Sequence, residues 1–80
     1  MAIKKLQQFH DELNFINALY CGINETDWET VVCKLSRLLT DVNNCKIYQS
    51  SQYRFQNYIL SKLKEDIKYE YDRVKEVLQN

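Results

Sequence analysis

The stretch TDWETVVCKLSRLLTDV, residues 26–42, indicates the fold class because its apolar side chains recur at helical spacing. These side chains are Trp28, Val31, Val32, Leu35, Leu38, Leu39 and Val42. A helix would carry all of them on one face. Thr26 and Glu29 have the capping-box form, in which the threonine hydroxyl accepts a first-turn N–H and the glutamate reaches back to the cap. We therefore expect a helix over residues 27–42, ending before an asparagine pair that favours a turn.

A similar pattern precedes this stretch. The recurring apolar residues there are Ala2, Leu6, Phe9, Leu13, Ile16 and Tyr20. Steps of four and three place them along one stripe of a helix. They predict a helix over about residues 2–21, with Gly22 as its left-handed stop.

A third helical pattern follows. Its inner residues are Tyr53, Gln56, Leu60, Leu63, Ile67, Tyr71, Val74 and Leu78. They predict a helix over about residues 51–79, for which Ser50 or Ser51 is a suitable N-cap. The alternative is a continuous helix from Asn44; we prefer the later start. At about 1.5 Å per residue this helix is the longest and should overhang the other two.

These patterns predict an all-α fold, an antiparallel three-helix bundle with a long C-terminal helix, in a single domain over residues 1–80. The chain has no proline and one glycine, so little interrupts its helices. No run of residues alternates in the manner of a strand.

Apolar and aromatic residues also occur on the outer faces of the first and third helices. They are Phe15, Leu19, Phe55, Tyr58 and Tyr69, and Arg73 lies near them on the third helix. Exposed aromatics with arginine nearby are typical of interface centres, so we expect these six residues to form a partner or self-interface. The alternative is that they are ordinary scattered surface aromatics.

No pattern indicates catalysis, a cofactor or a metal. His10 is the only histidine, and we expect it to be partly buried and structural. A zinc site would need His10 together with Cys21, Cys33 and Cys45, which the expected fold does not bring together. Cys33 should face outward, where its thiol could react. The chain lacks a glycine-rich phosphate loop, and we expect it not to be an enzyme.

Charge and composition restrict the possible partners. Eleven basic and eleven acidic residues give zero net charge, and the acidic residues of the third helix are interleaved with its basic ones. A nucleic-acid-binding regulator using the C-terminal helix is therefore the alternative and not the main hypothesis. The N-terminus lacks the apolar run of a signal peptide, and no stretch is long enough to span a membrane, so we expect a cytoplasmic protein.

The functional hypothesis is a small non-enzymatic helical protein-interaction module. A compact size, together with many residues encoded by A/T-rich codons, suggests a phage or mobile-element inhibitor that sterically occupies a host protein surface. We expect it to bind a protein partner and to form a homodimer or higher oligomer, because the outer aromatics and the overhanging helix need cover.

Overall fold

A computed structural model describes residues 2–20 and 25–79 of the chain. Its elements are α1 (Ala2–Tyr20), α2 (Trp28–Asn44), the short 3₁₀ turn η1 (Ser51–Tyr53) and α3 (Arg54–Gln79). The described residues contain no strand. The predicted all-α fold with three helices is confirmed.

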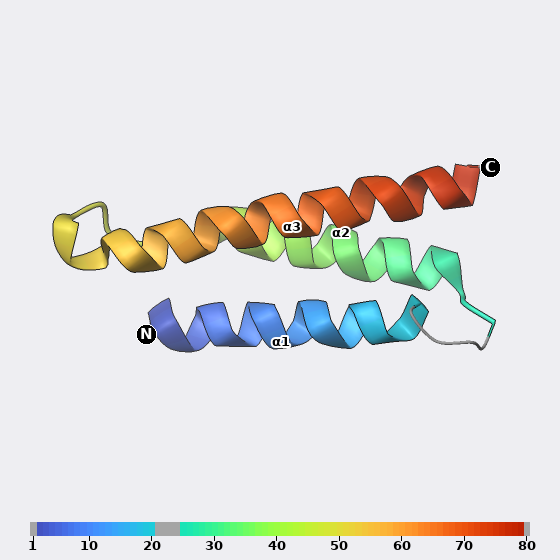
Figure 1. Cartoon of the computed structure of the whole chain (residues 1–80), viewed down its shortest axis with the longest axis horizontal. Helices are drawn as coiled ribbons and strands as arrows, with labels where there is room; N and C mark the ends of the chain where they lie inside the picture. Colours follow the sequence, from blue (N-terminus) through green and yellow to red (C-terminus); the bar gives the residue numbers. More distant parts are fainter. Residues whose placement is uncertain (1, 21–24, 80) are drawn as a thin grey trace.

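The three helices lie side by side, and each runs opposite to the one before it along the chain (Figure 1). The molecule is elongated, with principal extents of 44 × 20 × 15 Å. The beginning of α3, with η1 and the connection that precedes it, projects beyond the start of α1 and the end of α2 (Figure 1). The longest helix therefore carries surface that the other two do not cover.

Asp27, the residue after Thr26, caps the start of α2. Its carboxylate accepts hydrogen bonds from the Thr30 backbone N–H at 3.2 Å and from the Thr30 hydroxyl at 2.7 Å. The prediction that Thr26 is the cap was therefore wrong. The N-cap is the next residue, Asp27, whose carboxylate is long enough to accept a hydrogen bond from the backbone N–H of Thr30. These hydrogen bonds favour the ionised carboxylate and hold the pKa of Asp27 below its ordinary value of 3.8.

The other helix ends lie close to the predicted positions. α2 continues to Asn44, past its expected end at residue 42. Ser50 is the N-cap residue of η1 and has extended backbone, but its side chain makes no capping hydrogen bond. The predicted stop at Gly22 lies outside the described residues.

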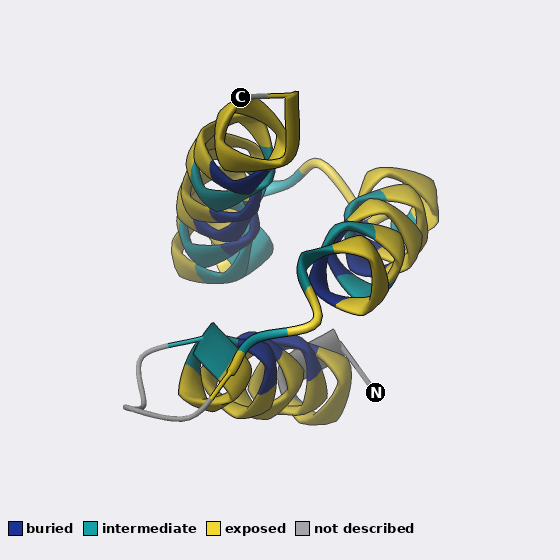
Figure 2. Cartoon of the chain, turned by 90° about the vertical axis from the view of Figure 1, so that its right-hand side faces the viewer, coloured by how far each residue is buried: buried dark blue, intermediate teal, exposed yellow. Residues whose placement is uncertain are grey.

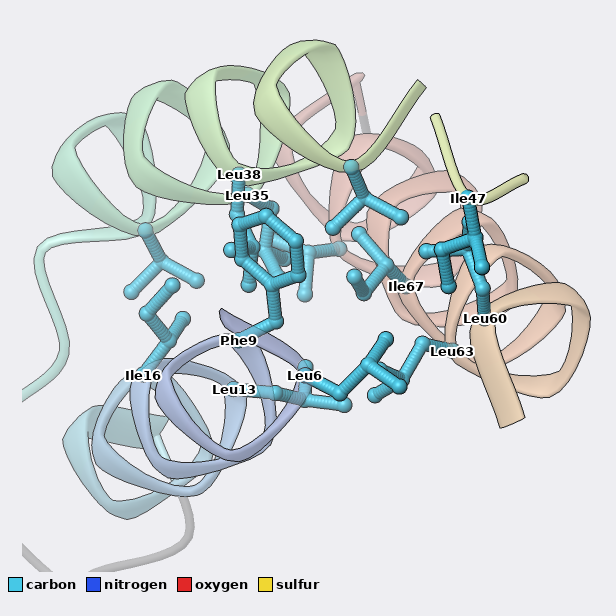
Figure 3. Packing of buried hydrophobic residues seen from close by; sticks show 13 residues of the cluster. Leu6, Phe9, Leu13, Ile16, Leu35, Leu38, Ile47, Leu60, Leu63 and Ile67 are labelled. Atoms are coloured by element: carbon cyan, nitrogen blue, oxygen red, sulfur yellow. The ribbon is translucent and has the colours of Figure 1, made fainter. Parts of the chain in front are cut away.

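The core consists of the inner faces of the three helices, which meet along the bundle (Figures 2 and 3). Its buried residues are Leu6, Phe9, Leu13, Ile16, Val31, Leu35, Leu38, Val42, Ile47, Leu60, Leu63, Ile67 and Val74. Phe9 of α1 points toward Leu35 and Leu38 of α2, while Leu6 points toward Leu63 of α3 (Figure 3). The core is therefore shared by all three helices.

Two residues differ from the predicted core. Leu78 was assigned to the inner stripe of α3, but it is 42% exposed, because it lies in the last turn of α3, which extends past the end of α1 (Figure 1). Ile47 was not predicted and is buried, since the connection from α2 to α3 folds it beside Leu60 (Figure 3). Tyr53 and Tyr71 are half-buried at the edge of the core, as predicted.

Candidate protein-binding groove

A groove of about 460 Å³ opens between α1 and α3. Its apolar floor includes the buried side chains of Leu6 and Leu63. Phe55 and Tyr58 line it from α3 and are 69% and 59% exposed. The other lining residues are Gln7 and His10 of α1 and Gln56, Ile59, Lys62 and Asp66 of α3. The groove thus combines a buried apolar floor with large aromatic side chains that reach into solvent.

The helical repeat of α3 explains how one edge of the groove is built. Starting at Phe55, steps of four and three residues lead to Ile59, Lys62 and Asp66, all of which line the groove. Tyr69 and Arg73 follow Lys62 and Asp66 at a spacing of seven, so they extend the same row toward the C-terminus. We call Phe55, Ile59, Lys62, Asp66, Tyr69 and Arg73 the α3 stripe. All of its members are exposed except Ile59, which is half-buried.

Contacts nearer the C-terminal end of α1 tie this helix to α3. The Tyr20 hydroxyl lies within hydrogen-bond distance of Asn17 and of Glu70 Oε2, the latter at 2.5 Å. The Tyr20 ring packs against Trp28, with ring centroids 5.8 Å apart. The groove lies toward the other end of α1, beside the overhanging part of α3. The open surface is therefore at the end of the bundle where α3 lacks cover.

One polar atom is buried in the groove region. The side-chain oxygen Oε1 of Gln56 is enclosed and accepts no hydrogen bond from the described residues. A buried carbonyl oxygen without a donor is unfavourable by about 1–3 kcal/mol. The oxygen is enclosed although Gln56 lines the groove, so this cost falls on the stability of the fold.

The charged residues around the groove interact locally and weakly. Lys62 Nζ lies 5.8 Å from the centroid of the Tyr58 ring and 3.7 Å from Glu65 Oε2. Both side chains of the Lys62–Glu65 pair are more than half exposed, so solvent screens their interaction. Lys68 and Asp72 form a similar pair at 3.5 Å. The basic residues of α3 are thus partly offset by acidic neighbours.

The predicted interface residues are all exposed, but they fall into two groups. Phe15 and Leu19 follow Gln8 and Glu12 at a spacing of seven, and those two residues line a hollow between α1 and α2. They therefore lie on the α2 side of α1. The other predicted residues are Phe55, Tyr58, Tyr69 and Arg73, which belong to the exposed side of α3.

Several exposed residues on this side of the bundle were not predicted from the sequence. Ile59, Lys62 and Asp66 were not assigned to it, although their spacing from Phe55 was a signal that could have found them. Tyr48, in the connection before η1, is 77% exposed and meets Tyr53 edge-on. No helical period covers that connection, so the position of Tyr48 could not be predicted from a local pattern.

His10 was expected to be partly buried. It is exposed and lines the groove on the α3 side of α1, so this expectation was wrong. The predicted outward position of Cys33 is confirmed. Cys21 lies outside the described residues.

No metal-binding cluster of three or more histidine, cysteine or acidic residues forms within the described part of the chain. None of the helices described combines the length and the apolar character needed to cross a lipid bilayer. The groove combines an apolar floor, an aromatic edge and a charged flank.

No protein-family model matches the chain, and neither a curated protein nor a solved structure matches it significantly. A function for this chain must therefore be argued from its surface chemistry.

Proposed function

We propose that this protein is a small non-enzymatic interaction module that binds an α-helix of a protein in the groove between α1 and α3. The observation that supports the proposal is the position of Phe55 and Tyr58, large and mostly exposed, beside the buried Leu6 and Leu63. Aromatic side chains next to an apolar floor are the usual anchors of protein interfaces, because they bury a large area while few torsions are frozen.

An amphipathic helix is the partner segment that this groove suits. Two roughly aligned helices flank the opening, and a third helix placed between them would contact both. Its apolar residues would meet Leu6, Ile59 and Leu63, as in other helix-in-groove complexes. Lys62 and Asp66 at the edge would set the orientation of the bound helix through charge.

The action of such a module is steric. By covering a helix of its target, the protein would exclude the target's other partners, which is how an inhibitor of a host protein would work. The assignment to a phage or mobile element depends on size and composition alone. The groove proposal does not depend on that assignment.

The test is to compare the wild type with the double variant Tyr58→Glu/Tyr69→Glu. A displayed library of amphipathic helical peptides would be selected against the wild type, and the affinity of the selected peptides would be measured for each variant. We expect the double variant to bind at least about 30-fold more weakly, as loss of central aromatic anchors does. Helical circular dichroism should be retained, because both tyrosines are exposed.

The matched control is Phe15→Glu, which places the same charge on an exposed aromatic position of α1 on its α2 side. Peptide binding to this control should equal binding to the wild type. If no peptide is selected at a concentration where the wild type is monomeric, or if the selected peptides bind the double variant and the wild type equally, the groove is not the binding surface.

A further inference from the structure

The α3 stripe is self-complementary about the level of Lys64. Lys62 and Asp66 are equally far from Lys64 along the chain and have opposite charges. Ile59 and Tyr69 form the next equidistant pair, and Phe55 and Arg73 form the outermost one. Each pair joins groups that attract: two opposite charges, two apolar groups, or an aromatic ring with a guanidinium. If a second stripe is placed beside the first in the opposite direction, each of these residues therefore faces a residue that attracts it.

We propose that the occupant of the groove is α3 of a second copy of this chain, packed antiparallel about a twofold axis at the level of Lys64. This inference depends on the proposed function of the groove as a protein-binding surface. In the dimer, Lys62 of each copy meets Asp66 of the other, and Tyr69 meets Ile59. Phe55 lies against Arg73 of the second copy. Every contact therefore occurs twice, as an isologous interface requires.

The charges select the antiparallel direction. In a parallel pair with the same register, Lys62 would face Lys62, Asp66 would face Asp66 and Arg73 would face Arg73. Like charges that face each other oppose association, so the antiparallel pair is favoured over the parallel one. The spacing of four and three residues is that of a helix seam in either direction, so the charges alone distinguish the two. Lys62 is free to change partner, because its present contact with Glu65 is solvated.

The exposed area is suitable for such a dimer. Phe55, Tyr58 and Tyr69 are 69%, 59% and 63% exposed. With about 150–250 Å² for each ring, these three side chains alone offer about 400 Å² per copy. The rest of the stripe and the α1 edge of the groove extend this toward the roughly 800 Å² per partner of a standard interface. The second α3 would also cover the floor at Leu6 and Leu63.

The test uses two charge variants that cannot dimerise alone but should dimerise together. In Lys62→Glu, two acidic side chains would face each other at each charge contact; in Asp66→Lys, two basic ones would do so. Each variant should have a dimer dissociation constant at least tenfold above the wild-type value, measured by analytical ultracentrifugation with reductant present. In a one-to-one mixture all four facing charges are opposite, so heterodimers should form.

Native mass spectrometry would identify the heterodimer, since the two variants differ in mass. The double variant Lys62→Glu/Asp66→Lys within one chain should also recover self-association. Lys68→Glu is the control, because Lys68 lies on the same helix but outside the stripe and the groove lining. It should leave the dimer dissociation constant unchanged. Circular dichroism would verify that each variant is as helical as the wild type.

A wild type that stays monomeric at the highest attainable concentration would overturn the proposed dimer. So would a wild-type dimer whose dissociation constant neither single variant changes, or a mixture without heterodimers. The peptide selection separates these failures from failure of the proposed function: groove-dependent peptide binding by a monomer would retain the groove as a binding surface and remove only the second copy as its occupant.

Discussion

Leu35→Ala should remove a large part of the stability of this protein. Leu35 lies on α2 and has no exposed surface, and Phe9 of α1 points toward it (Figure 3). Truncation removes buried methyl groups and leaves a cavity, which together cost about 2–5 kcal/mol. A domain of this length has a total free energy of unfolding of about 4–12 kcal/mol. The substitution therefore removes a substantial fraction of the free energy of unfolding. We expect a loss in the upper part of the range of about 2–5 kcal/mol, because the surrounding core residues limit collapse into the cavity.

The assay is urea unfolding followed by circular dichroism at equal protein concentration. With a denaturant dependence of about 1–1.5 kcal/mol per molar urea for a small protein, a loss of about 2–5 kcal/mol should lower the midpoint by roughly 1.3–5 M. Leu78→Ala is the control, since Leu78 is 42% exposed in the last turn of α3 and its truncation should change the free energy of unfolding by less than about 0.5 kcal/mol. A loss below about 0.5 kcal/mol for Leu35→Ala would refute the assigned core.

Two further predictions concern local interactions. Hydrogen bonds from Thr30 hold the pKa of Asp27 below 3.8 in the folded state. The ionised carboxylate therefore stabilises the fold fully above about pH 4, and this stabilisation is lost as the pH falls through the lower pKa of the folded state. The melting temperature of Asp27→Ala should therefore lie below that of the wild type at pH 7, with a gap that narrows below about pH 4; a pH-independent gap would contradict this. Gln56→Leu removes a buried oxygen that accepts no described hydrogen bond, so urea unfolding should show equal or greater stability, and a loss above about 1 kcal/mol would show that the amide is satisfied.

The inner faces of the helices could be predicted from sequence because they depend on a local period. Ile16, Leu35 and Ile67 are fully buried and were all assigned to inner stripes. Leu78 has the same period but lies where the bundle ends, and no local pattern encodes the position of that end. Ile47 is in an irregular connection, whose path depends on the helices it joins. The errors therefore occur where burial depends on tertiary arrangement.

The outward direction of the aromatic residues could also be predicted from sequence, but not their neighbours. Three helices with one inner stripe each can form two bundles of opposite handedness. The side of α1 that faces α2 in one bundle faces α3 in the other. In the observed arrangement His10 lies on the α3 side, and Phe15 follows the row of Gln8 toward α2. Helical periodicity is identical for both hands, so it could not separate Phe15 from Phe55 and Tyr58.

The groove connects binding with stability. Leu6 and Leu63 belong to the core and also form the floor of the groove, so a helix seated there would extend the core as well as occupy a surface. A ligand that binds only the folded chain raises its apparent stability by mass action, and a second copy does so in proportion to protein concentration. Lys62 and Asp66 limit this gain, because burying two charge pairs costs desolvation energy. They fix direction and register in return, as polar residues in helix seams do. The α3 stripe therefore suits an oriented and reversible association, whose affinity is set mainly by its members Phe55 and Tyr69 and by the adjacent Tyr58.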